Sequence, residues 1–86
     1  MRRSEILAAV AEVARRHVGH TGELAEEQRL AEDLGLDSIR LLVLAAEVEN
    51  RFRVAFEPAD DARIRTVGDL VDAVVEKLAA PSGALP

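Results

Sequence analysis

The stretch LAEDLGLDSIR, residues 30–40, marks the point where a loop runs into the most apolar helix that the sequence predicts. Gly35 interrupts regular structure, and Asp37 offers a side-chain oxygen that can cap the helix after it. Ser38 then falls in or just before the first helical turn, where backbone N–H groups have no partner inside the helix. An anionic group attached to the Ser38 hydroxyl, such as a phosphodiester, would be stabilised there by free donors and by the helix dipole.

The helix that begins at Ser38 is predicted to extend to about Arg51, with apolar residues on two sides. The side expected to face the core holds Leu41, Leu44, Ala45, Val48 and Phe52. The opposite side holds a second apolar patch of Ile39, Leu42, Val43 and Ala46. A polar strip holds Arg40, Glu47 and Arg51. An apolar patch on a small domain needs either a cover or a partner. The preceding loop could bury part of it, Leu42 above all, or the patch could dock a partner protein next to Ser38.

A first helix is predicted to start at Ser4, a capping residue, with Glu5 in the first turn where the helix dipole favours a carboxylate. Its apolar stripe has helical spacing and consists of Ile6, Leu7, Val10, Val13, Ala14 and either His17 or Val18. Gly19 and Gly22 bracket a polar break, so the helix is expected to stop near Val18.

A long connection follows, from Gly19 to Leu36. Loops of this length are uncommon in compact domains unless they are functional or held down. Four leucines are expected to pin this loop over the helices: Leu24, Leu30, Leu34 and Leu36. Its acidic pairs, Glu26-Glu27 and Glu32-Asp33, are expected to be solvated.

No metal site is predicted. His17 and His20 are three residues apart, but no third ligand is evident, so both are expected to face solvent at a fraying helix end. Asp60 and Asp61 are adjacent and lack the alternate-residue spacing of oxygens in a calcium loop.

The C-terminal third of the chain predicts one short and one long helix. Pro58 ends any regular run before it, and residues 59–64 allow about one and a half helical turns. The last helix opens with TVGD, residues 66–69, a variant of the capping box. Its apolar stripe consists of Val67, Leu70, Val71, Val74, Val75 and Leu78. Pro81 is expected to stop this helix, which gives one domain of residues 1–80 and a flexible tail of residues 81–86.

These elements predict an all-α fold, a small antiparallel four-helix bundle with three long helices, one short helix and a long first loop. The net charge of −5 argues against nucleic acid as a partner and suits proteins with basic docking surfaces. The absence of cysteine excludes disulfides, a thiolate nucleophile and cysteine-bound metals. No apolar run reaches membrane-spanning length, and no signal-peptide core follows the first residues. A monomeric cytoplasmic protein without membrane contact is therefore expected.

The motif DLGLDSI, residues 33–39, resembles the attachment motif of acyl carrier proteins, usually Asp-Leu-Gly-x-Asp-Ser-Leu. The long first loop and the segment IRTVGDLV, residues 64–71, resemble the same family, so the likeness covers nearly the whole chain. It implies that Ser38, preceded by Asp37, carries a covalent 4′-phosphopantetheine arm. A phosphopantetheinyl transferase would take this arm from coenzyme A.

The resemblance also implies a carrier rather than an enzyme. The thiol of the arm would hold acyl intermediates as thioesters and present them to separate enzymes such as a ketosynthase, acyltransferase or ligase. The chain itself has no Ser-His-acid set, no phosphate-cradling glycine loop and no evident pair of catalytic carboxylates. The expected docking residues are Ile39, Arg40, Val43, Ala46, Glu47 and Glu49.

Departures from the family pattern bear on the pathway. Fatty-acid carriers usually have acidic residues just after the serine and one turn later, where this chain has Arg40 and Val43, and Ile39 replaces the usual leucine. These differences favour polyketide, antibiotic or other specialised biosynthesis. A peptidyl carrier of a nonribosomal pathway is an alternative, although such carriers often have Gly-Gly where this chain has Gly35-Leu36. A plain helical interaction domain, in which Asp37 or Ser38 only caps the helix, is the other alternative.

Overall fold

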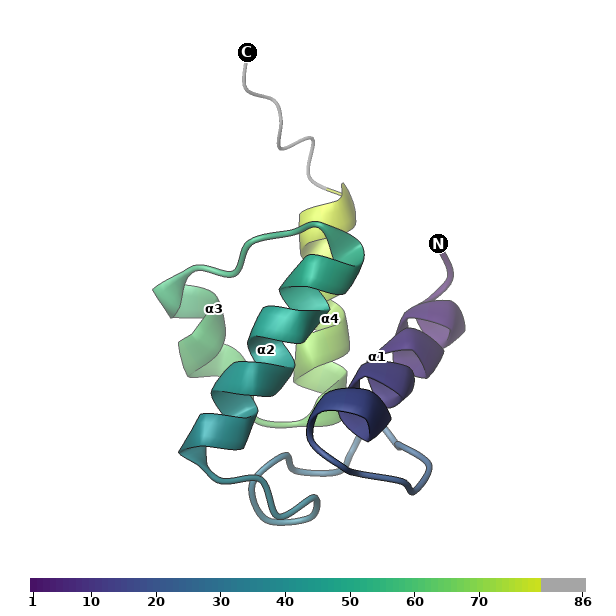
Figure 1. Cartoon of the computed structure of the whole chain (residues 1–86). Helices are drawn as coiled ribbons and strands as arrows, with labels where there is room; N and C mark the ends of the chain where they lie inside the picture. Colours follow the sequence, from purple (N-terminus) through teal and green to yellow (C-terminus); the bar gives the residue numbers. More distant parts are fainter. Residues whose placement is uncertain (80–86) are drawn as a thin grey trace.

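The computed structural model describes residues 1–79, which form four α-helices and no strand (Figure 1). The helices are α1 (Arg3–His17), α2 (Ser38–Phe52), α3 (Pro58–Arg63) and α4 (Val67–Ala79). Consecutive helices run in opposite directions, and the loop between α1 and α2 crosses one end of the bundle (Figure 1). The predicted fold, three long helices and one short helix with a long first loop, is confirmed.

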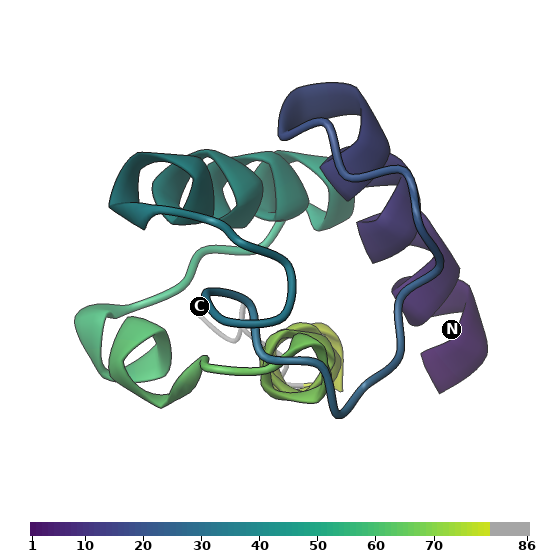
Figure 2. The ribbon, with the colours of Figure 1, turned by 90° about the horizontal axis from the view of Figure 1, so that it is seen from below.

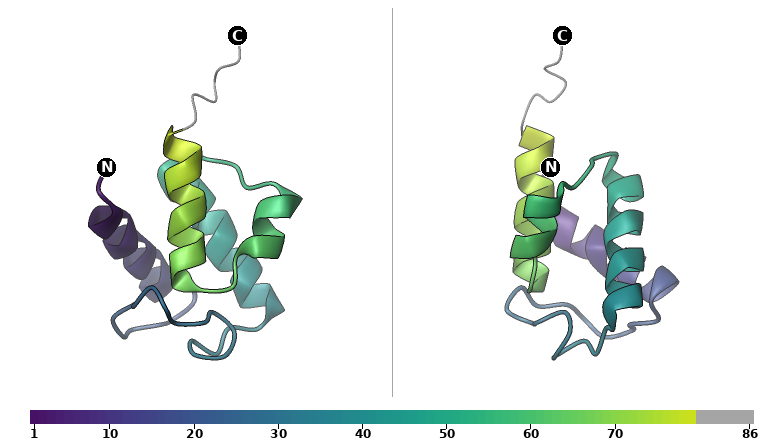
Figure 3. Two further views of the ribbon diagram at one scale, coloured as in Figure 1. Left: turned by 180° about the vertical axis from the view of Figure 1, so that it is seen from behind. Right: turned by 90° about the vertical axis from the view of Figure 1, so that its left-hand side faces the viewer.

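α1 packs against both α2 and α4, and α4 lies between α1 and α3 (Figure 3, left). Their shared core is almost entirely aliphatic, and its fully buried larger side chains are Ile6, Val10, Leu44, Val48, Val67, Leu70, Val71 and Val74. Burial of this apolar surface is the main favourable term for a domain of this size. None of the helices in residues 1–79 is long and apolar enough to cross a lipid bilayer.

α1 begins two residues earlier than a cap at Ser4 would require. Arg2 is the N-cap, because the Oε1 atom of Glu5 accepts the N–H of Arg2 at 2.7 Å, and Ser4 lies inside the first turn. The predicted cap at Ser4 was wrong, since Glu5 reaches back by three residues and fixes the start there. The helix ends at His17, and Gly19 follows with φ +74°, close to the predicted stop.

The last turn of α4 is less buried than the rest of its apolar stripe. Val75 and Leu78 continue the apolar stripe, but they are 36% and 43% exposed rather than buried. They line a shallow apolar hollow at the end of the bundle together with Met1, Ile6 and Ala79. Helical spacing identifies the apolar face of α4, but it does not show at which residue the neighbouring helices stop covering that face. The predicted stop at Pro81 and the tail of residues 81–86 lie outside the described residues.

The long loop is pinned as predicted. Leu30 and Leu36 are buried, and Leu24 and Leu34 pack half-buried against the core. Backbone hydrogen bonds also attach the loop to the start of α4, because the N–H of Gly68 donates to the carbonyl of Glu26 at 2.8 Å. A Cβ atom at position 68 would lie 3.0 Å from that carbonyl oxygen, so the close approach favours glycine.

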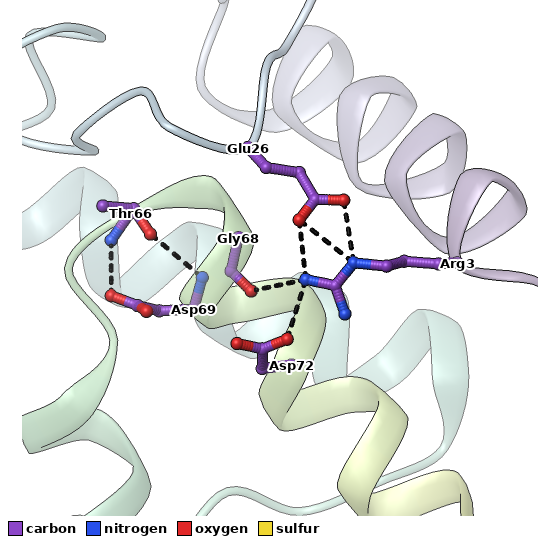
Figure 4. A network of polar contacts seen from close by, with 6 residues as sticks. All are labelled: Arg3, Glu26, Thr66, Gly68, Asp69 and Asp72. Atoms are coloured by element: carbon purple, nitrogen blue, oxygen red, sulfur yellow. Dashed lines mark hydrogen bonds and ion pairs between the residues drawn. The ribbon is translucent and has the colours of Figure 1, made fainter.

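An ion-pair cluster closes the loop against two helices (Figure 4). The Nη2 atom of Arg3 on α1 lies 2.6 Å from Glu26 Oε1 in the loop and 2.7 Å from Asp72 Oδ1 on α4. The hydrogen bond to Glu26 and the one to Asp72 raise the pKa of Arg3, and the bond from Arg3 lowers the pKa of Glu26. Glu26 was therefore wrongly predicted to be merely solvated.

The predicted capping box of α4 is confirmed. The N–H of Asp69 donates to Thr66 Oγ1, and the N–H of Thr66 donates to Asp69 Oδ2, both at 3.0 Å (Figure 4). These two bonds satisfy donors that the first turn of a helix leaves free. The N–H groups of Arg65 and Thr66 also keep the pKa of Asp69 below its usual range.

Ion pairs attach the short helix α3 to α4. Asp60 is 6% exposed, and its Oδ2 atom accepts the N–H of Glu57 at 2.8 Å and lies 3.0 Å from Lys77 Nζ. Arg63 also links the two helices, since its Nη2 lies 3.1 Å from Asp60 Oδ1 on α3 and 3.2 Å from Glu76 Oε1 on α4. The N–H of Glu57, then Lys77 and Arg63, lower the pKa of Asp60.

Leu44→Ala should lower the free energy of unfolding by about 2–4 kcal/mol, because Leu44 is 1% exposed and its truncation leaves a cavity. Leu42→Ala is the matched control on the same helix, and since Leu42 is 68% exposed its effect should stay below about 1 kcal/mol. Urea denaturation followed by circular dichroism measures both. Similar losses for the two variants would mean that α2 is rotated differently.

Asp60→Asn should destabilise the protein at pH 7, and the difference from the unsubstituted protein should shrink as the pH falls below about 4. The reason is that a carboxyl with a lowered folded pKa stabilises the fold above its ordinary pKa and loses that contribution as it protonates. Asp61→Asn, a neighbouring exposed aspartate, is the control and should change little. Thermal unfolding between pH 3 and pH 7 makes the comparison. A pH-independent difference for Asp60→Asn would contradict this account.

Candidate functional site

Ser38 is the first residue of α2 and is exposed at the helix tip. Asp37 is the N-cap, as the sequence predicted, and its Oδ1 atom accepts the N–H of Arg40 at 2.8 Å. The Ser38 hydroxyl forms no hydrogen bond with any other residue in the range 1–79. The capping role is therefore filled by Asp37, and the hydroxyl of Ser38 is left available for chemistry.

The turn before Ser38 is anchored in the core by Leu36. Gly35 has φ +71°, a conformation that favours glycine, and it turns the chain between Leu34 and Leu36. Leu36 is 5% exposed, and its N–H donates to the carbonyl of Leu30 at 3.2 Å. The loop thus enters α2 along a fixed path, which keeps Ser38 at the surface while the residue two places earlier is buried.

A largely apolar cavity of about 330 Å³ opens beside Ser38. The loop, α2, α3 and α4 surround this region of the bundle (Figure 2). The residues that line the cavity are Leu30, Ser38, Leu41, Leu42, Leu44, Ala45, Asp61, Ile64 and Leu70. Its volume lies at the lower end of the range for small-ligand pockets. A group attached to Ser38 could therefore place an apolar portion inside the bundle.

Sequence reasoning did not predict this cavity. Leu41 and Ala45 were assigned to the core stripe, but both are half-buried and line the cavity, and Leu41 also packs against the edge of the core. The small side chain of Ala45 between larger apolar residues was the available signal. Asp61 and Ile64 line the cavity only because α3 folds back toward α2. The periodicity of apolar residues in the sequence does not reveal that path.

The outer face of α2, defined as Ile39, Leu42, Val43 and Ala46, is largely open. Ile39 is 72% and Leu42 68% exposed, Ala46 is exposed, and Val43 is half-buried against the core. The idea that the preceding loop buries Leu42 was wrong, because that loop crosses the end of the bundle instead of this face (Figure 1). An apolar surface next to Ser38 is thus left uncovered by residues 1–79.

The charged residues of α2 lie mostly beside this face. Glu47 Oε1 is 3.6 Å from His17 Nε2 on α1, and Arg51 Nη1 is 2.8 Å from Glu12 Oε1 on the same helix. The Oε2 atom of Glu49 accepts the N–H of Phe56 at 2.6 Å. Arg40 is exposed in the first turn. The hydrogen bond and charge of Arg51 lower the pKa of Glu12.

The two histidines differ in environment. His17 is exposed as predicted, but the Nε2 atom of His20 is buried without a hydrogen-bond partner in residues 1–79, which contradicts the predicted solvent position. The ring lies against Gly22 because the loop folds back after Gly19. In the described part of the chain, no three histidine, aspartate or glutamate side chains gather in a way that could hold a metal ion.

The exposed hydroxyl fits the attachment of a phosphate ester. The free N–H groups of the first turn and the positive end of the α2 dipole favour an anion at this tip, while the adjoining cavity offers apolar surface. The fold does not have to rearrange for this attachment, since Ser38 is already exposed to solvent. The residues present are therefore compatible with a phosphodiester-linked prosthetic group.

Comparison with known proteins points to one family. The family model described as "Phosphopantetheine attachment site" matches residues 4–74. The acyl carrier protein of Thermotoga maritima is 36% identical over 77 residues, which cover 88% of this chain and 95% of that protein. The meromycolate extension acyl carrier protein of Mycobacterium tuberculosis is 35% identical over 75 residues. That match covers 86% of this chain but only 64% of the mycobacterial protein.

Solved structures agree with the sequence comparison. The crystal structure of the Thermotoga maritima acyl carrier protein matches with a TM-score of 0.78 and 33% identity, covering 91% of this chain and 92% of that one. The acyl carrier protein of Enterococcus faecalis matches with a TM-score of 0.69 and 28% identity, covering 90% and 99% of the two chains. With this fold and these relatives, the chain belongs to the acyl carrier protein family, whose covalent cofactor is 4′-phosphopantetheine.

Proposed function

We propose that Ser38 carries the 4′-phosphopantetheine arm and that the protein holds acyl intermediates as thioesters on its thiol. The observation that carries this proposal is the exposed Ser38 hydroxyl at the tip of α2, which has no hydrogen-bond partner in residues 1–79 because Asp37 does the capping. The motif around it, DLGLDSI, falls inside the segment matched by the attachment-site family model.

The protein acts as a carrier, and separate enzymes perform the chemistry. A phosphopantetheinyl transferase forms the phosphodiester at the Ser38 oxygen, using coenzyme A as donor. Ser38 has no histidine or lysine beside it in the cavity lining, so the base that removes its proton comes from the transferase. Tethering then raises the concentration of the cargo at each partner's active site and keeps an activated intermediate from diffusing away.

The cavity beside Ser38 is the place where a short acyl chain can shelter. Its lining is mostly aliphatic and includes Leu41 and Leu42 from α2 and Ile64 after α3. Among the lining residues in the described part of the chain, Asp61 is the charged one. Burial of an apolar chain there is favoured by the hydrophobic effect, and withdrawal of the chain into an enzyme returns the cavity to its empty state. Ala45 leaves room for the chain because its side chain is small.

Members of this family interact with modifying and synthetic enzymes, and we place their docking surface on α2. The candidate residues are Ile39, Arg40, Val43, Ala46, Glu47 and Glu49. The specific partners would be the transferase and an acyl-loading or acyl-processing enzyme such as a ketosynthase, acyltransferase or ligase. Ile39 and Ala46 support this placement because they are exposed apolar residues on the same helix as Ser38.

The cargo we propose is an acyl group of a polyketide or another specialised pathway. Arg40 and Val43 stand where fatty-acid carriers usually have acidic residues, which changes the partners that are tolerated. The mycobacterial relatives are named for meromycolate extension, which supports an acyl rather than an aminoacyl cargo.

Incubation with coenzyme A, Mg²⁺ and a broad-specificity phosphopantetheinyl transferase should add one phosphopantetheinyl unit to the protein, as measured by intact-protein mass spectrometry. Ser38→Ala should gain none, because the attacking oxygen is absent. Ser4→Ala is the matched control, since Ser4 is also exposed near the start of a helix, and it should be loaded like the unsubstituted protein. Unchanged mass under all conditions would overturn the carrier proposal.

Ile39→Ala should leave the free energy of unfolding within about 0.5 kcal/mol of the unsubstituted protein, because the side chain is 72% exposed. It should nevertheless lower kcat/KM for loading by the transferase, since an apolar docking contact is lost. Leu78→Ala, an exposed apolar residue on α4, is the control for loading. A stability loss equal to that of Leu44→Ala would show that Ile39 belongs to the core instead.

A further inference from the structure

The surface around Ser38 differs in charge from the protein as a whole. The chain carries a net charge of −5, yet the outer face of α2 holds no carboxylate. Its exposed members are Ile39, Leu42 and Ala46, and Asn50 lies in the same direction at 100° per residue. A partner that approaches this face therefore meets apolar surface rather than the acidic surface that the net charge suggests.

The two glutamates of α2 lie to either side of that face. Glu47 lies toward α1, where its Oε1 atom is 3.6 Å from His17 Nε2. Glu49 lies on the other flank, where its Oε2 atom accepts the N–H of Phe56 at 2.6 Å. Both side chains are half-buried, and they flank the outer face of α2 instead of lying on it.

Two aspartates border the site but are not on the face. Asp37 precedes Ser38, and the Oδ1 atom of its carboxylate accepts the N–H of Arg40. Asp61 is exposed on α3, across the cavity from α2. Neither interrupts the apolar surface that runs from Ile39 to Ala46.

Arg40 is the charged side chain closest in sequence to Ser38 on the helix itself. It is exposed and makes no ion pair with any residue in the range 1–79. A cation in the first turn faces the positive end of the helix dipole, so Arg40 does not stabilise α2. Arg53 adds a second exposed cation at the C-cap of the same helix. In the described part of the chain, the unpaired charge on the first turn of α2 is thus that of Arg40.

We infer that enzymes acting on the Ser38 arm dock on the outer face of α2. The rim of such an enzyme's active-site entrance would be apolar and would carry a carboxylate opposite Arg40. The inference rests on the proposed function, because an enzyme that reaches an arm at Ser38 must cover the first turns of α2. Apolar contact supplies most of the binding free energy, and the ion pair at Arg40 fixes orientation and selects the partner. A basic rim is disfavoured because it would oppose Arg40 without meeting a free carboxylate on this face.

The test uses the transferase itself as the probe, because it must dock at Ser38. Two versions of a broad-specificity phosphopantetheinyl transferase are prepared, in which surface residues at the rim of the active-site entrance are changed to glutamate or to lysine. Loading of the unsubstituted protein should be about tenfold faster in kcat/KM with the acidic rim, and Arg40→Glu should reverse that preference. Arg2→Glu makes the same change in charge at the N-cap of α1 and should preserve the original preference. The start of α1 and the start of α2 lie at opposite ends of the bundle (Figure 1).

The outcomes separate the docking inference from the proposed function. If Ser38 gains no pantetheinyl adduct, both fail. If Ser38 is loaded but the rim charge has no effect, or the basic rim is preferred, only the docking inference fails. Leu42→Glu should slow loading with both rims. If Leu42→Glu instead converts a dimer to a monomer in sedimentation experiments, the face is an interface between two copies of the chain, and the docking inference is overturned.

Discussion

The hydrogen bond from the N–H of Arg40 to the side chain of Asp37 is the constraint on which the site depends. At 2.8 Å it fixes the first turn of α2 and supplies the cap that Ser38 would otherwise provide. The Ser38 hydroxyl is consequently left at the surface without an internal partner. The same turn directs Ile39 and Leu42 outward and Leu44 inward, so one cap sets both the attachment point and the face beside it.

The loop and the short helix give this turn its surroundings. Leu30 and Leu36 anchor the loop in the core, and Arg3 and Glu26 close it against α1 and α4. Asp60 and Lys77 hold α3 near α4 and so keep one wall of the cavity in place. The bundle therefore presents an exposed serine and an apolar face, both on α2, beside an apolar cavity whose walls also come from the loop, α3 and α4.

Most features governed by local rules could be predicted from the sequence, although the N-cap of α1 is Arg2 and not Ser4. The cap at Asp37, the capping box of Thr66 and Asp69, and the start of α2 at Ser38 follow from residues a few positions apart. Features set by distant contacts could not. Glu26 pairs with Arg3, 23 positions away, and Leu42 is exposed because the loop takes another path. The cavity likewise depends on how α3 folds back, which no periodicity in residues 58–63 reveals.

The most direct measurement is fragmentation mass spectrometry of peptides from the protein isolated from the cells that make it. The account predicts that the pantetheinyl group resides on the peptide containing Ser38, that fragment ions assign it to the Ser38 oxygen, and that its thiol carries an acyl group in part of the material. A pantetheinyl group on any other residue, or protein from metabolically active cells that carries none, would contradict it.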